Sequence, residues 1–223
     1  MGLFSSLLII LLWTLHLFWT LYFVDVSLIN GWIYLHILIQ MHLTTGLFIS
    51  AHDSIHGTVH NNKNINHLIG SICSFLYAFF PYRVLRKNHY AHHKYPGTEN
   101  DPDFNIKTQN FFLWWGGFLV RYASWIQIIA FAIVFNILKI WFSGTSIWVF
   151  YFLPIFLSSL QLFYFGTFKP HKLPHYQLDN KHKARTQQKN HLWAFISCYF
   201  FGYHLEHHER PDIPWWKLHQ SKI

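Results

Sequence analysis

Three short stretches of the chain hold histidines at spacings that suit metal binding. The pattern H-x-x-H-H occurs at His89–His93 and again at His204–His208, and the shorter pattern H-x-x-x-H occurs at His52–His56. Residues three and four positions apart lie on one face of a helix, so each of these histidine boxes can direct two or three imidazoles to one point. Because imidazole is the commonest side-chain metal ligand, the boxes predict a metal site.

The number of box histidines indicates more than one metal ion. Eight imidazoles are too many for one tetrahedral zinc, but they suit two metal ions that share a site. A single histidine is more often a core or surface residue than a ligand, whereas three boxes in a chain of 223 residues argue against chance. The predicted ligands from the boxes are His52, His56, His89, His92, His93, His204, His207 and His208.

The types of ligand restrict the chemistry of the site. Neutral imidazoles bind iron, copper, nickel and zinc. Carboxylates are scarce beside the boxes, and Glu206 follows His204 by two residues, which places it off the ligand face of a helix. An all-histidine set leaves two strongly cationic metals, which suits the reductive activation of O2. Zinc has no redox chemistry, so a redox reaction at this site requires iron.

Three aspartates are candidate hydrogen-bond acceptors for the N–H groups of the ligands. Asp53 follows His52 and could reach a histidine of another box, while Asp101 and Asp103 lie in a proline- and glycine-containing loop after the second box. At least one of the three is expected to accept a hydrogen bond from a ligand. Carboxylates in this role orient the ring of a metal-bound histidine. The alternative is that they cap turns or neutralise nearby Arg and Lys side chains.

The composition indicates an integral membrane protein with a single domain over residues 1–223. The chain is 52% hydrophobic and only 12% charged, whereas soluble domains are about 25% charged. Its net charge is +8. Because the basic residues flank long apolar stretches, they favour contact with anionic lipid over binding of nucleic acid.

The apolar stretches predict an all-α fold with about four transmembrane helices and additional interfacial helices. Residues 3–24, 31–51, 111–140 and 146–168 are the candidate spans. The shorter stretch 65–82 is expected to re-enter or lie in the interface, because the three boxes can form one site only if they lie on the same side of the membrane.

The remaining segments are expected to deliver and flank the site. Residues 191–203 predict an interfacial helix that leads into the third box, and residues 211–216 predict an aromatic anchor at the membrane interface. His36 and His42, within the second apolar stretch, are expected to form hydrogen bonds between helices.

Residues 61–110 hold six Lys and Arg and residues 169–223 hold nine. The positive-inside rule therefore predicts boxes on the cytoplasmic side.

The boxes, in this order and with two apolar stretches between the second and the third, resemble the membrane fatty-acid desaturase and hydroxylase superfamily. Their flanking residues resemble bacterial β-carotene ketolases of the CrtW type over about residues 45–218. Members of that family usually carry more polar sequence before the first span, and they have Leu in place of Lys169 and Pro in place of His219. The segments that carry the resemblance are H-D-S-I-H-G at 52–57, P-G-T at 96–98, D-P-D-F at 101–104, F-G-T at 165–167, P-H at 170–171, F-G-Y at 201–203 with the third box, and P-W-W at 214–216.

The resemblance implies oxidation of C4 of a β-ionone ring to a ketone, using O2, two iron ions and an external electron donor such as ferredoxin. Two successive hydroxylations would give a geminal diol, which loses water. The resemblance also implies that the eight box histidines are iron ligands and that His171, in the shared P-H motif, is a ninth. His60, His175, His182 and His191 are expected to lie outside this set. The preference for plain or 3-hydroxylated rings stays open.

Other functions remain compatible with the boxes. A carotenoid 3-hydroxylase or a lipid desaturase on the same scaffold would give a different product from β-carotene. A histidine-rich metal transporter is the non-enzymatic alternative, but a transporter places its ligands at mid-membrane depth on several spans. Here the boxes lie at or beyond the ends of the predicted spans.

Overall fold

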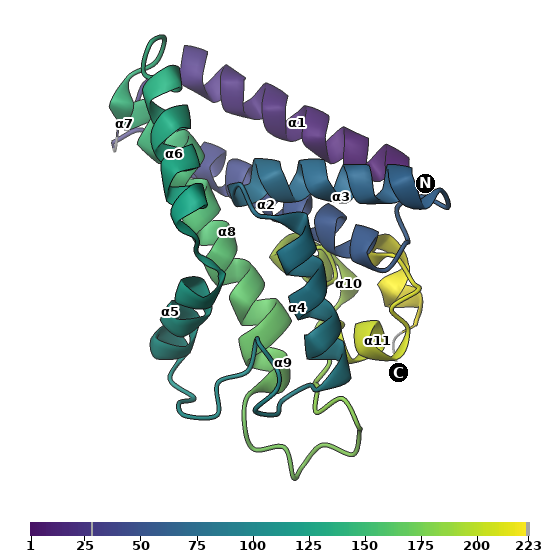
Figure 1. The fold of residues 1–223 in the computed structure, drawn as a ribbon. Helices are drawn as coiled ribbons and strands as arrows, with labels where there is room; N and C mark the ends of the chain where they lie inside the picture. The colour runs from purple at the N-terminus through teal and green to yellow at the C-terminus, as the bar shows by residue number, and fades with distance from the viewer. Residues whose placement is uncertain (28, 222–223) are drawn as a thin grey trace.

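The fold is all-helical throughout the described part of the chain, residues 1–27 and 29–221 of a computed structural model (Figure 1). It contains no strand within those residues, as predicted. The helices, in chain order, are α1 (Gly2–Phe23), α2 (Trp32–Ile55), α3 (Lys63–Ala78), α4 (Tyr82–Lys94), α5 (Phe111–Tyr122), α6 (Trp125–Leu138), α7 (Gly144–Ile147), η1 (Trp148–Phe152), α8 (Leu153–Phe163), η2 (Tyr164–Phe168), α9 (Lys169–His171), α10 (His191–Cys198), α11 (His204–Glu209) and η3 (Trp215–Gln220).

Three helices in the described residues are long and apolar enough to cross a membrane. They are α1, α2 and the continuous helix from Gly144 to His171, with mean hydropathies of 1.9, 1.3 and 1.7. These helices coincide with the predicted spans 3–24, 31–51 and 146–168. The last two extend beyond the predicted ends, so that His52 and His171 belong to the final turns of spanning helices.

The long helix Gly144–His171 is interrupted by two π-helical segments, η1 and η2. Such segments occur frequently at functional sites because they rotate the face that the following residues present. Here η2 immediately precedes the turn that carries His171. The Thr45 hydroxyl of α2 donates a hydrogen bond to Gln161 of α8 and shares another with the Ser158 hydroxyl, and these bonds fix the helix beside α2.

Helices α3 and α4 form a hairpin that begins and ends beside the last turn of α2. The two helices meet at an angle of 99°. Asn66, in the first turn of α3, donates a hydrogen bond to the Ser54 carbonyl, and Tyr90, near the end of α4, donates to the Ile55 carbonyl at 2.7 Å. Both ends of this bent pair therefore lie near one end of α2, and re-entry of residues 65–82 stays a prediction.

The apolar stretch 111–140, expected as one crossing, is divided into two helices that meet at 87°. Ala123 and Ser124 are extended, and Ser124 starts α6 through a capping box with Gln127. The Gln127 side chain also donates to the Ala78 carbonyl at the end of α3. The break therefore comes from a local capping signal and a tertiary contact, three residues after Arg121.

The C-terminal region turns sharply to deliver the third box. Tyr199 and Phe200 adopt left-handed conformations, with φ of 46° and 61°, and they end α10 just before α11 begins. The predicted aromatic anchor at 211–216 packs partly against the protein. The Trp215 ring lies 5.0 Å from that of Tyr199, and its backbone N–H donates to Asp53.

Candidate metal centre

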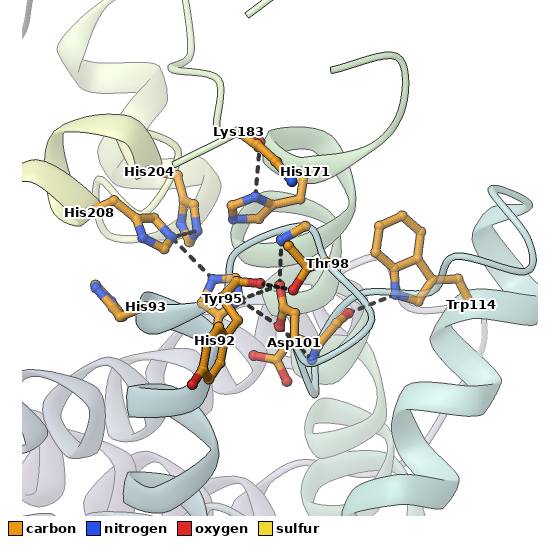
Figure 2. Close-up of polar contacts among 12 residues, drawn as sticks. His92, His93, Tyr95, Thr98, Asp101, Trp114, His171, Lys183, His204 and His208 are labelled. Atoms are coloured by element: carbon orange, nitrogen blue, oxygen red, sulfur yellow. Dashed lines mark hydrogen bonds and ion pairs between the residues drawn. The ribbon is translucent and has the colours of Figure 1, made fainter. Parts of the chain in front are cut away.

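Eight histidines form two adjacent groups of four at the ends of α2, α4, α9 and α11. Within each group, one ring nitrogen from every member lies within 4.8 Å of the others. Figure 2 shows the second group together with His93. The first group is His52, His56, His89 and His207, and the second is His92, His171, His204 and His208.

The distances between ring nitrogens are those of ligands around a common centre. The Nε2 atoms of His56 and His89 lie 2.7 Å apart, and those of His204 and His208 lie 3.0 Å apart. Two nitrogens bound to one metal at about 2.1 Å, and at right angles, are about 3 Å apart. Both groups therefore have the spacing that a metal ion requires.

His93 lies between the two groups. Its Nε2 atom is 3.0 Å from that of His207 in the first group, and its ring stacks on His208 of the second group at 4.3 Å. The structure thus brings together all eight box histidines and His171, which are the nine residues that the sequence singled out as ligands.

Hydrogen bonds to the opposite ring nitrogens orient two members of the second group. The Nδ1 atom of His92 donates to both carboxylate oxygens of Asp101 at 3.0 Å, and the Nδ1 atom of His171 donates to the Lys183 carbonyl at 3.1 Å (Figure 2). Such contacts set the tautomer and leave Nε2 free as a ligand. They also connect the site to two loops, after α4 and after α9.

Asp101 is itself held rigidly. One of its carboxylate oxygens accepts from the Gly97 N–H and the other from the Asp103 N–H, both at 2.8 Å. The carboxylate is almost completely buried. It therefore fixes the loop and the His92 ring together.

Several buried ring nitrogens lack hydrogen-bond partners in the described structure. They include both nitrogens of His52 and the Nε2 atom of His171. An unpaired buried polar group costs about 1–3 kcal/mol, and coordination of a metal ion would remove this cost. The donor set, the spacing and these unpaired atoms all fit a pair of metal ions.

The three histidines of α11 are held in the form that binds metal. Burial, and then the neighbouring imidazoles, keep the pKa of His204, His207 and His208 well below its usual value. Neutral imidazole is the ligand form of histidine. These three histidines can therefore bind metal near neutral pH without first losing protons.

The other two predicted aspartates do not contact a ligand of another box. Asp53 lies 3.5 Å from its neighbour His52 and accepts a hydrogen bond from the Trp215 N–H at 3.0 Å. Asp103 accepts a hydrogen bond from the Tyr122 hydroxyl. Asp53 does not reach across to another box, because its side chain holds the C-terminal segment instead.

The remaining histidines of the basic loops lie outside the two groups, as expected. His175 donates to the His171 carbonyl at 2.6 Å, and His191 bonds to the Tyr203 hydroxyl at 2.7 Å. His182 is nearest to the site, with its ring 5.3 Å from that of His208. The Lys183 carbonyl could not be predicted as an acceptor, because a backbone oxygen carries no residue-type signal.

An apolar cavity of about 440 Å³ reaches the centre. It is lined mainly by aromatic and aliphatic side chains of α3, α5, α6 and α8. Four histidines of the two groups, His52, His89, His92 and His204, form part of its wall. Such a cavity suits an apolar ligand that extends to the metal site.

Comparison with known proteins gives the same family for both halves of the chain. The fatty acid desaturase family matches residues 28–139 and 119–222. The β-carotene ketolase of a Paracoccus species (strain N81106) is 34% identical over 183 residues, which cover 81% of this chain and 75% of that protein. No solved structure shows significant similarity.

Two algal proteins are related to a similar degree. A β-carotene 4-ketolase of Haematococcus lacustris is 36% identical over 79% of this chain, and a zeaxanthin 4-ketolase of Chlamydomonas reinhardtii is 36% identical over the same share. This chain spans only 58% and 41% of their respective lengths. From the family match and the shared identity, the chain belongs to the fatty acid desaturase family, among the relatives of the β-carotene ketolases.

Proposed function

We propose that this protein is a β-carotene 4-ketolase, which converts the C4 methylene of a β-ionone ring to a ketone. The products would be echinenone, canthaxanthin or, from 3-hydroxylated rings, astaxanthin. The single observation that carries the proposal is the apolar cavity whose wall includes four histidines of the two metal-binding groups. The relatives named as ketolases support the same reaction.

The nine histidines are proposed to hold two iron ions, which supply the redox chemistry that activates O2. The apolar lining of the cavity binds the ring and polyene chain and keeps water away from the reacting carbon. Asp101 and the Lys183 carbonyl hold the rings of His92 and His171 in place. The protein thus provides orientation and a dry site, and the metals provide the oxidising power.

The reaction requires two rounds of oxidation at one carbon. Each hydroxylation consumes one O2, two electrons and two protons, and it releases one water. The first replaces one C4 hydrogen by a hydroxyl, and the second gives a geminal diol, which loses water to form the ketone. The electrons come from an external donor protein such as ferredoxin.

The site is proposed to lie at the cytoplasmic face of a bacterial inner membrane, where the carotenoid enters from the lipid. Basic residues are concentrated in the loops beside the boxes, which the positive-inside rule assigns to the cytoplasm. Cysteines introduced at Asn62 and Lys87 should react with an impermeant thiol reagent from the same side. Labelling from opposite sides would contradict the hairpin topology of α3 and α4.

Expression in a bacterium that makes β-carotene tests the proposed activity. We expect 4-keto products, identified by chromatography and mass spectrometry. A 3-hydroxy product would indicate a carotenoid hydroxylase. Unchanged β-carotene, with iron retained by the purified protein, would favour a lipid desaturase or another substrate.

A further inference from the structure

The metal end of the apolar cavity contains one carboxylate that does not orient a histidine. Among the described residues that line the cavity, Asp103 is the only acidic one. One ligand atom from each of His92, Asp101 and Asp103 lies within 4.8 Å of the others. Asp103 is therefore close to the proposed reacting centre, yet it makes no hydrogen bond to a histidine.

The position of Asp103 is fixed by its neighbours on three sides. Its N–H donates to Asp101 and its carbonyl accepts from the Trp114 indole, both at 2.8 Å, and its Oδ1 atom accepts from the Tyr122 hydroxyl. Figure 2 shows the bond to Trp114. Its second carboxylate oxygen, Oδ2, has no hydrogen-bond partner in the described structure. One oxygen is thus held by Tyr122 while the other is available to a ligand in the cavity.

Two other polar side chains of the cavity wall are already engaged with the protein. Gln127 bonds to Ser124 and to the Ala78 carbonyl, and Ser159 donates to the Phe156 carbonyl at 2.7 Å. A hydrocarbon ring needs no polar partner. Binding of the starting substrate therefore does not explain why the Asp103 carboxylate lines the cavity. A ring that has gained a hydroxyl does need one, because a buried hydroxyl without a partner is costly.

We propose that Asp103, supported by Tyr122, accepts a hydrogen bond from the hydroxyl of the C4-hydroxy intermediate and retains it for the second oxidation. This inference rests on the proposed ketolase function. In this role Asp103 touches the substrate after the first round only. It would decide whether the enzyme releases an alcohol or continues to the ketone.

The variant Asp103→Leu removes the acceptor, and the double variant Asp103→Leu/Tyr122→Phe removes both partners, so that no buried hydroxyl is left unpaired. Both should release 4-hydroxycarotenoid, with the ratio of 4-hydroxy to 4-keto product raised roughly tenfold or more, because hydrogen bonds to charged acceptors are among the stronger ones. Asp103→Asn keeps an acceptor oxygen and should restore most of the ketone.

Two further measurements separate this role from a structural one. With 4-hydroxy-β-carotene supplied as substrate, Asp103→Leu should raise KM roughly tenfold with less change in kcat, since a weakened hydrogen bond to the hydroxyl affects its binding. The iron content should equal that of the wild type. Asp101→Asn is the matched control, because it acts through His92 and should lower alcohol and ketone together.

The results distinguish the failure of this inference from the failure of the proposed function. If the wild-type protein makes no ketone, the proposed function itself is wrong. If the wild type makes ketone but both Leu-containing variants lower alcohol and ketone in the same proportion, or keep the wild-type product ratio, Asp103 does not hold the intermediate. Loss of iron from Asp103→Leu together with both products would assign it a structural role instead.

Discussion

Helix α2 carries two sets of polar residues that differ in their hydrogen bonding. Near its start, His36 and Gln40 bond to His16 of α1, and at its end His52 and His56 join the histidine centre. In the first set, the His16 nitrogens lie 2.6 Å from Gln40 Oε1 and 3.3 Å from His36 Nδ1. In the second, both nitrogens of His52 are buried without a hydrogen-bond partner.

The difference shows what separates a structural histidine from a candidate ligand in an apolar setting. The group of His16, His36 and Gln40 satisfies its polar atoms across the helix interface, as polar groups inside membranes usually do. The histidines of the centre instead gather their ring nitrogens in two adjacent groups, and several of these nitrogens, including both of His52, have no other partner. Convergence of ring nitrogens, rather than the presence of histidine, indicates the site.

Removing a ligand should have the largest effect. His92→Ala and His208→Ala each delete one nitrogen of the second group, and we expect loss of bound metal and of ketone formation to background. The protein should still insert into the membrane, because its spans do not depend on the site. Metal analysis and membrane fractionation check both points, with His36→Ala as the matched control that keeps its metal.

Loss of a positioning contact should have a smaller effect. Asp101→Asn keeps the shape of the side chain but removes the charge that holds the His92 ring, and we expect a loss of roughly 10–100-fold in metal affinity or activity. A metal titration monitored by the optical spectrum measures it. Asp53→Asn should have little effect on metal affinity, because Asp53 bonds to Trp215; equal losses in the two variants would contradict the assignment.

The stability of the metal-free protein should fall as the pH is lowered. Folding lowers the pKa of His204, His207 and His208 below the ordinary 6.5, so the unfolded chain binds more protons in acid. The contribution of these histidines to the free energy of unfolding is therefore complete above about pH 6.5. Below that pH it declines by at most about 1.4 kcal/mol per group and pH unit. Thermal unfolding of metal-free protein between pH 8 and 5 tests the sign. A melting temperature that rises towards acid would contradict it.

Substitutions in the hydrogen-bonded group of His16, His36 and Gln40 should have the smallest effect on metal content and activity. Gln40→Leu removes the partner of His16 while keeping an apolar side chain of similar size. We expect a loss of about 0.6 kcal/mol in stability, the average for hydrogen bonds between membrane helices. Iron content and product yield should be unchanged. Loss of iron from this variant would contradict the claim that this group is structural and separate from the metal ligands.

Much of the fold was predictable because long apolar runs and repeated histidine spacing are strong signals. These signals predicted the spans that correspond to α1, α2 and Gly144–His171 and the grouping of the three boxes, whereas His171 came only from the family resemblance. The break between α5 and α6 was missed because hydrophobicity dominated that stretch. The pattern Ser124-Trp125-Ile126-Gln127, a capping box, was present in the sequence and marks the start of α6.

The separate roles of the aspartates could not be predicted. Spacing alone does not tell Asp101 from Asp103, although the first bonds to His92 and the second faces the cavity. Their difference depends on how the loop folds back over α4. That folding is set by long-range contacts, including the bond from Trp114 to the Asp103 carbonyl.

The metal content of the active protein tests the central claim most directly. Protein purified from membranes and analysed by mass spectrometry for metals should contain two iron ions per chain, and His208→Ala should contain fewer. One zinc and no iron in protein that forms ketone would contradict the account.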